Sequence, residues 1–120
     1  MLTERGLTMR VFITGGTGFI GAAVIRELLG AGHEIIGLAR SAKAREALTA
    51  MGAAVVLDGS LEDPDSLRRG AEAGEAVIHL AFIHNFADFA ASAQTDKLAI
   101  EAIGEALIGT GKTFIVTSGV

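Results

Sequence analysis

Residues 14–21 read TGGTGFIG, and this stretch decides how the rest of the 120-residue chain can fold. It follows Arg10–Thr14 (RVFIT), a short apolar run with β-branched residues that predicts a buried strand. It leads into Gly18–Ala31, where apolar residues recur at helical spacing and Gly32 stands at the position of a C-terminal cap. The apolar positions of this helix are Ile20, Val24, Ile25, Leu28 and Leu29. A strand, a glycine-rich turn and a helix in this order predict the first unit of an α/β sheet.

The alternation of strand and helix continues along the chain. The further predicted strands are Glu34–Ala39, Ala53–Leu57, Glu75–Ala81 and Lys112–Ser118. The further predicted helices are Ser41–Met51, with Ser41 as N-cap and Gly52 as stop, Asp63–Gly70, which opens on Asp-Pro, and Asp88–Ile108. The last helix has Leu98, Ile100, Ile103, Leu107 and Ile108 as its apolar positions. Apolar strands separated by helices predict a doubly wound parallel sheet with strand order 3-2-1-4-5, which ends after the fifth strand.

Composition limits the class of protein. Half of the residues are hydrophobic and 20% are charged, so we expect one globular domain over residues 9–120 behind a flexible extension, residues 1–8. The net charge of −4 comes without a basic cluster, which argues against nucleic-acid binding. No apolar run is long enough for a membrane span, and the N-terminus has no signal-peptide core. The absence of cysteine excludes disulfides and thiolate zinc sites, and we expect a cytoplasmic protein.

The glycines of TGGTGFIG each have a physical role. Gly15 permits the tight exit from the strand, Gly18 lets a pyrophosphate approach the backbone, and Gly21 allows the helix to pack closely on the sheet. The helix N-terminus offers N–H groups and a partial positive charge to phosphates. The sequence therefore predicts a dinucleotide site made by Gly15, Gly16, Thr17, Gly18, Phe19, Ile20 and Gly21.

The spacing Gly15-x-x-Gly18-x-x-Gly21 closely resembles the fingerprint of the extended short-chain dehydrogenase/reductase superfamily, of the NAD(P)-dependent epimerase/dehydratase type. The resemblance extends from Met9 to Val120 and includes GLARS at 37–41, VIHLA at 77–81 and VTS at 116–118. It implies a Rossmann fold, a bound NAD(P) and, in the complete enzyme, hydride transfer to or from a small hydroxyl- or carbonyl-bearing metabolite such as a nucleotide sugar.

The residues after the second strand bear on the choice of cofactor. An acid there would bind the ribose hydroxyl of NAD, whereas an arginine accommodates the 2′-phosphate of NADP. The chain has Arg40 and Ser41 and no acid, which favours NADP over NAD. A solvated loop arginine is the alternative for Arg40.

Further contacts are implied by the resemblance alone. Gly59-Ser60-Leu61 looks like the Gly-Asp-Leu segment that holds the adenine, with Ser60 in place of Asp. Ala81 and Phe82 match positions that line the adenosine ribose, although Phe82 could equally be a packing residue. Ser118 matches the catalytic Ser or Thr of the superfamily, with Thr117 as a neighbouring candidate.

The catalytic Tyr-x-x-x-Lys pair of the superfamily is missing, because the chain contains no tyrosine. We therefore expect a fragment of a longer enzyme, which binds cofactor without turnover, and leave a non-catalytic dinucleotide-sensing module as the alternative. A homodimer through the open edge of the fifth strand is a third reading. His33, His79 and His84 lack ligand spacing, so we predict buried or loop histidines and no metal site.

Overall fold

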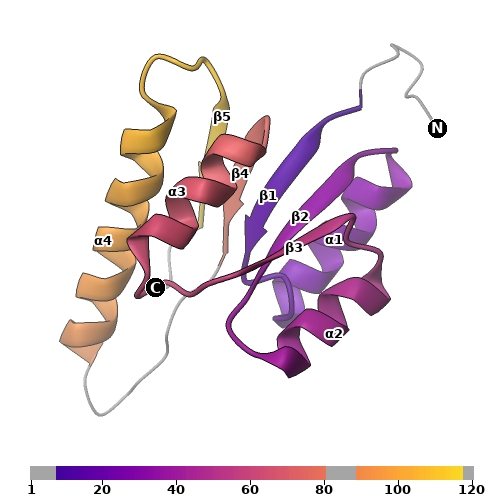
Figure 1. Cartoon of the computed structure of the whole chain (residues 1–120), viewed down its shortest axis with the longest axis horizontal. Coiled ribbons are helices and arrows are strands. Elements are labelled where there is room, and N and C mark those ends of the chain that lie inside the picture. Colours follow the sequence, from indigo (N-terminus) through magenta and orange to yellow (C-terminus); the bar gives the residue numbers. More distant parts are fainter. Residues whose placement is uncertain (1–7, 81–88, 118–120) are drawn as a thin grey trace.

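The computed structural model describes residues 8–80 and 89–117, and within them one parallel sheet alternates with helices (Figure 1). The strands are β1 (Arg10–Thr14), β2 (Glu34–Ala39), β3 (Val55–Asp58), β4 (Ala76–His79) and β5 (Thr113–Val116). The helices are α1 (Phe19–Gly30), α2 (Ala42–Met51), α3 (Pro64–Ala73) and α4 (Phe89–Leu107). The sheet order is β3-β2-β1-β4-β5 with every pair parallel, so the predicted order 3-2-1-4-5 is confirmed.

The two faces of the sheet bury separate apolar clusters. Val11 and Ile13 of β1 pack with Ile25 of α1 and Leu48 of α2. Phe12, which points to the opposite face, packs with residues of α3 and α4. Figure 1 shows the same division, with α1 and α2 on one side of the sheet and α3 and α4 on the other. Alternate residues of β1 therefore serve both layers, as a strand with two covered faces requires.

Helices α2 and α3 begin at residues whose side chains cap them. The hydroxyl of Ser41 accepts the N–H of Ala44 at 3.1 Å, and Gly52 ends α2 in the left-handed region with φ 106°. The carboxylate of Asp63 accepts the N–H of Ser66 at the start of α3, with Pro64 in the first turn. Parallel strands bring these helix N-termini to the same edge of the sheet, where the cavity described below is found.

Most element boundaries differ from the prediction by one or two residues, and two of the differences have identifiable reasons. We expected β3 to begin at Ala53, but the N–H of Ala53 bonds the carbonyl of Leu48 as part of the end of α2. We expected α3 to stop at Gly70, but the helix continues to Ala73. Gly70 lies inside the helix, and a glycine is needed there because the ring of Phe12 occupies the space that a Cβ would need. A glycine selected by packing resembles a helix stop when the sequence is read alone.

The buried face of α4 agrees only in part with the prediction, since Ile103 and Leu107 are buried as predicted but other positions are not. Leu98 and Ile108 are 50% and 79% exposed, whereas the buried positions include Ala99, Ala102 and Ile103. Small side chains on this face let α4 approach α3 closely, so the size of a side chain outweighed its hydrophobicity here. None of the helices within residues 8–80 and 89–117 combines the length and apolar character needed to cross a membrane.

Candidate functional site

A cavity of about 630 Å³ opens at the carboxyl edge of the sheet. Two loops border it: the glycine loop between β1 and α1, and residues 59–62 between β3 and α3. Its remaining lining comes from positions at or near the ends of β2, β4 and β5 and from the first turn of α2: Leu38, Arg40, Ala44, Leu80 and Thr117. The cavity is thus made by segments far apart in the sequence that the parallel topology gathers at one edge.

The glycine loop is tightly wound. Gly15 has φ +75°, in the left-handed region, and its carbonyl accepts the N–H of Gly18 at 3.1 Å. A Cβ on Gly21 would overlap that same carbonyl of Gly15, so the first turn of α1 presses directly on the loop backbone. The role predicted for Gly21, close packing of the helix, is seen here against the loop. A Cβ on Gly18 would meet its nearest protein atom at an ordinary 3.4 Å, so packing within the chain does not require glycine there.

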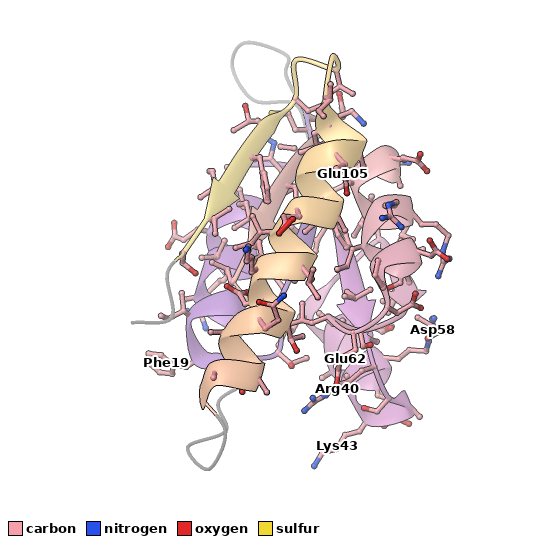
Figure 2. The ribbon with its side chains drawn as sticks, turned by 90° about the vertical axis from the view of Figure 1, so that its left-hand side faces the viewer. Phe19, Arg40, Lys43, Asp58, Glu62 and Glu105 are labelled. Atoms are coloured by element: carbon pink, nitrogen blue, oxygen red, sulfur yellow. The ribbon has the colours of Figure 1, made fainter. Side chains whose placement is uncertain are left out.

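The N-terminus of α1 has no side-chain cap. Gly18 is the N-cap residue, no side-chain cap is found among the described residues, and the first turn contains no acid. The N–H groups of Phe19, Ile20 and Gly21 have no carbonyl partner within the helix by geometry. The side chain of Phe19 is 95% exposed and extends away from the molecule (Figure 2), so this turn offers the cavity its N–H groups and the positive end of the helix dipole.

Arg40 is exposed at the end of β2 and borders both the main cavity and a smaller hollow of about 320 Å³ beside it. Figure 2 shows Arg40 and Lys43 at the same end of the molecule. Ser41 lines only the smaller hollow, and its hydroxyl is engaged in capping α2. Asp58 also lines this hollow and forms an ion pair with Arg45 at 2.8 Å. Arg45 thus offsets the negative charge of Asp58 at the end of β3.

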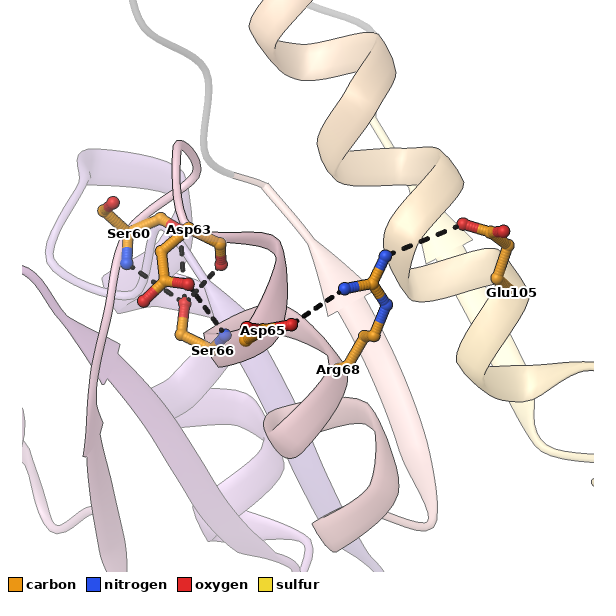
Figure 3. A network of polar contacts seen from close by, with 6 residues as sticks. All are labelled: Ser60, Asp63, Asp65, Ser66, Arg68 and Glu105. Carbon is orange, nitrogen blue, oxygen red and sulfur yellow. Dashed lines mark hydrogen bonds and ion pairs between the residues drawn. The ribbon is translucent and has the colours of Figure 1, made fainter.

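Side-chain hydrogen bonds hold the loop opposite the glycines (Figure 3). The buried hydroxyl of Ser66 accepts the N–H of Ser60 at 3.2 Å and donates to the carbonyl of Asp63 at 2.7 Å. A Cβ on Gly59 would collide with Ser66, so the loop lies directly on the helix. Leu61 is buried while still bordering the cavity. The segment Gly59–Leu61, compared above with the adenine-holding segment, is therefore rigidly placed beside the cavity.

A cluster of three polar side chains lies at the ends of β1 and β4 and on α4. Thr14 Oγ1 and His79 Nδ1 are 2.7 Å apart, and His79 Nε2 is 2.7 Å from Asp96 Oδ1. The prediction of a buried histidine fits His79, which has no exposed area. Asp96 was missed. A signal for it was available, because Asp96 lies three residues before Ala99 and seven before Ile103, which puts its carboxylate on the buried face of α4.

The structure brings most of the predicted binding residues to one place. All residues from Gly15 to Gly21 border the main cavity together with Arg40, Ser60 and Leu61. Ala81, Phe82 and Ser118 lie outside the described residues, and Thr117, the neighbour of Ser118, borders the cavity. Sequence reasoning missed the lining residues Leu38, Ala44, Glu62 and Leu80. Leu38 and Leu80 lie within one residue of a strand end, Ala44 lies in the first turn of α2, and Glu62 directly precedes the N-cap of α3.

Comparisons with known proteins agree with this geometry. A model of the NAD dependent epimerase/dehydratase family matches residues 11–108. An uncharacterised protein of Schizosaccharomyces pombe is 46% identical over 110 residues, covering 92% of this chain and 37% of its own. The sterol-4-alpha-carboxylate 3-dehydrogenase (decarboxylating) of Dictyostelium discoideum is 39% identical over 71 residues, covering 59% of this chain and 21% of its own.

A solved structure has the same fold. The enzyme WbmG of Bordetella bronchiseptica, in complex with NAD and UDP, superimposes with a TM-score of 0.77 and 28% identity. The match covers 96% of this chain and 39% of WbmG. The chain thus spans less than two fifths of the length of these relatives. The Rossmann-like sheet, the glycine loop and the family match lead to one conclusion: the chain belongs to the NAD dependent epimerase/dehydratase family, as an NAD-binding domain of oxidoreductase-like enzymes.

Proposed function

We propose that the chain holds a dinucleotide across the carboxyl edge of its sheet. The pyrophosphate lies at the N-terminus of α1, the adenosine ribose beside Arg40, and the adenine beside Ser60 and Leu61. The observation that carries this proposal is the uncapped first turn of α1 facing a cavity of about 630 Å³. Exposed N–H groups at a helix N-terminus form a ready anion site.

The residues present fit such a ligand. Gly18 borders the cavity although protein packing alone would tolerate a side chain there, and a Cβ would take space next to the N–H groups. No carboxylate stands in the first turn of α1 to repel a phosphate. The cavity is large enough for a cofactor-sized ligand. The chain therefore supplies a cradle of backbone donors with room for an anion.

We further propose that NADP is preferred over NAD. Arg40 presents a planar guanidinium, which suits bidentate phosphate contacts, at the hollow beside the main cavity. Arg45 neutralises Asp58 at the same hollow, so a phosphate there meets less repulsion. Ser41 borders the hollow with its helix start.

For the whole protein we propose hydride transfer on a small hydroxyl- or carbonyl-bearing metabolite. Support comes from the family match, from the dehydrogenase of Dictyostelium discoideum and from the NAD-bound Bordetella enzyme. The nicotinamide, when bound, supplies the hydride chemistry, and the residues of this chain bind and orient it. Ser118 remains a candidate for substrate binding. We also propose that the protein acts in the cytoplasm.

A titration with NADPH and NADH, followed by cofactor fluorescence, tests the binding proposal. We expect NADPH to bind more tightly, with Arg40→Ala removing roughly tenfold of that preference, the loss of about one charged hydrogen bond. Arg69→Ala, an exposed arginine of α3 that does not border either cavity, is the matched control. Circular dichroism checks that each sample is folded. A folded chain that binds neither cofactor would contradict the proposal.

The alternative, a non-catalytic dinucleotide-sensing module, binds the same cofactor and needs a separate test. The discriminating measurement is cofactor oxidation by the full-length protein with a panel of carbonyl compounds, and cofactor reduction with the matching alcohols. Turnover of a pair supports the enzyme. Tight binding with no exchange of hydride in either direction supports the module.

A further inference from the structure

Two charged side chains of opposite sign border the main cavity, within the part of the chain that the structure describes. Arg40 lies at the end of β2, and Glu62 lies in the loop between β3 and α3. Both side chains are exposed, and Figure 2 shows them at the same end of the molecule. The proposed function gives Arg40 a phosphate to bind but gives Glu62 no role. A carboxylate at the border of a site for an anionic cofactor repels the phosphates, so its presence has to be explained.

Glu62 differs from the acids that follow it in the chain. The carboxylate of Asp63 caps α3, and that of Asp65 pairs with Arg68 at 3.0 Å. For Glu62, no hydrogen bond or ion pair of the side chain is found within residues 8–80 and 89–117. Asp63 and Asp65 thus serve the helix, whereas the carboxylate of Glu62 is available to a ligand in the cavity.

The polar side chains around the cavity differ in what they can accept and donate. The hydroxyls of Thr17, Ser60 and Thr117 do both, and the guanidinium of Arg40 only donates. A hydroxyl can turn to suit either an amino group or a carbonyl group of a ligand, so it does not distinguish between them. An ionised carboxylate only accepts. Among the described residues that border the cavity, Glu62 therefore has the one side chain that can select a ligand by its amino group.

The surface next to Glu62 suits a flat apolar ring. Leu61, the preceding residue, is buried in the same apolar cluster against which Leu38 packs, and both border the cavity. Leu38 also lies against the loop, because a Cβ on Gly59 would come within 3.0 Å of its Cδ1 atom. An aromatic base placed beside Leu61 thus meets apolar side chains, with a carboxylate one residue farther along the chain.

We propose that Glu62 selects adenine as the base of the cofactor by accepting a hydrogen bond from its 6-amino group. The inference rests on the proposed function, which places the adenine beside Ser60 and Leu61. In hypoxanthine a carbonyl oxygen replaces the amino group and repels a carboxylate. The hydrogen on N1 of hypoxanthine is adjacent to this oxygen, so a carboxylate that approaches it meets the same repulsion. Arg40 thus acts on the phosphate and Glu62 on the base.

The test compares NADPH with its hypoxanthine analogue, deamino-NADPH, in fluorescence titrations. We expect the original chain to bind NADPH about tenfold more tightly than the analogue, the effect of one charge-assisted hydrogen bond. In Glu62→Gln, whose amide both donates and accepts, this ratio should fall to about twofold. The two ligands share their phosphates, so a change in repulsion of the phosphates leaves the ratio unaltered.

Two further variants sharpen the comparison. Glu62→Asp keeps the charge on a shorter side chain and should retain part of the preference, with a ratio of about threefold. Glu101→Gln, at an exposed position of α4 that borders neither cavity, removes the same charge elsewhere and should leave the ratio unchanged. Circular dichroism confirms that each variant is folded. Because the Glu62 side chain is exposed, we expect all of them to fold.

The outcomes separate this inference from the proposed function. If the original chain binds NADPH and deamino-NADPH equally well, the dinucleotide site stands and the inference is wrong. The inference is also wrong if Glu62→Gln keeps the full preference for NADPH, since groups other than the carboxylate then select the base. If the original folded chain binds neither dinucleotide, the proposed function itself is refuted, and the inference with it.

Discussion

Three helices of this chain start at the same edge of the sheet, and their N-termini are treated differently. At α2 and α3 the chain closes its own first turn, with Ser41 and Asp63 accepting backbone N–H groups. At α1 the N-cap residue is Gly18, which has no side chain to offer. Each capped turn satisfies one of its N–H donors with a side chain of the protein, while the first turn of α1 keeps its donors available to the cavity. A capping side chain such as Ser or Asp would also suit the N-terminus of α1. The glycine at this position therefore marks the helix where the stability of a side-chain cap is absent.

The same contrast extends to the loops. Residues 59–63 are held by the side chains of Ser66 and Asp63, whereas the glycine loop is held by backbone contacts and the close approach of Gly21 to Gly15. In the loop of residues 59–63, side chains hold the backbone on the side that faces α3. In the second loop only Thr17 among residues 15–18 has a side chain, so the backbone itself forms most of the contact surface. A site for a charged ligand is therefore expected at the second loop and a supporting wall at the first.

The largest effect is expected from a substitution that disrupts the close contact between Gly21 and the carbonyl of Gly15 in the glycine loop. Gly21→Ala places a Cβ against the carbonyl of Gly15. We expect the free energy of unfolding to fall by about 3 kcal/mol, at the upper end of overpacking effects, with loss of cofactor binding. Urea unfolding measures it. The control is Gly104→Ala in α4, where, apart from the backbone of α4 itself, no atom of the described residues lies within 4 Å of the added Cβ, and where we expect the free energy of unfolding to rise by about 0.5 kcal/mol. Equal effects at the two glycines would contradict the close packing at Gly21.

The second change makes α1 resemble the other two helices. Gly18→Asp supplies a capping carboxylate at a residue whose backbone, with φ −75° and ψ 171°, already suits an N-cap. We expect the unfolding free energy to rise by about 0.5 kcal/mol and NADPH binding to weaken about a hundredfold, because the carboxylate occupies and repels the phosphate position.

Gly18→Asn is the matched variant that caps without charge. It should stabilise the helix similarly and weaken binding less, which separates repulsion from lost space. Calorimetry and thermal unfolding on the same samples provide both numbers. If Gly18→Asp retained full affinity, the first turn of α1 would not be the phosphate site.

The third change opens a capped turn. Asp63→Ala removes the acceptor at the start of α3 and should lower the unfolding free energy by about 1 kcal/mol. Because Ser66 still bonds Ser60 and the carbonyl of residue 63, we expect cofactor affinity to change by less than about threefold. Urea unfolding and the fluorescence titration measure the two effects. A large loss of affinity with little loss of stability would place Asp63 in the binding site instead of the supporting wall.

The smallest effect is expected on the outer surface of the same helix. Arg68 contacts Asp65 at 3.0 Å and Glu105 of α4 at 3.9 Å, as Figure 3 shows. These side chains are well exposed, so Arg68→Ala should lower the free energy of unfolding by about 0.5 kcal/mol or less and leave cofactor binding unchanged. The cost should shrink further in high salt. A cost above that of Asp63→Ala would mean that the α3–α4 contact depends on this pair.

The sequence was informative wherever a local rule had one physical cause. Ser41 and Asp63 were recognisable as caps, and the bounds of β1 and β2 agree with the apolar runs. Prediction failed where a residue served a distant neighbour. Gly70 looked like a helix stop because its partner, the ring of Phe12, is 58 residues away in the chain. Asp96 was missed because its partner His79 lies on another element.

The chain's own pattern determined the α/β class, the strand order and the place of the glycine loop, since apolar periodicity, turn residues and crossover handedness are local or topological constraints. Tertiary structure decided which side chains meet. The pairing of His79 with Thr14 and Asp96, the offset of Asp58 by Arg45 and the lining contributed by Leu38 and Glu62 depend on contacts between distant segments. Such contacts are set by packing distances of a few ångströms, and these exist only once the sheet has formed.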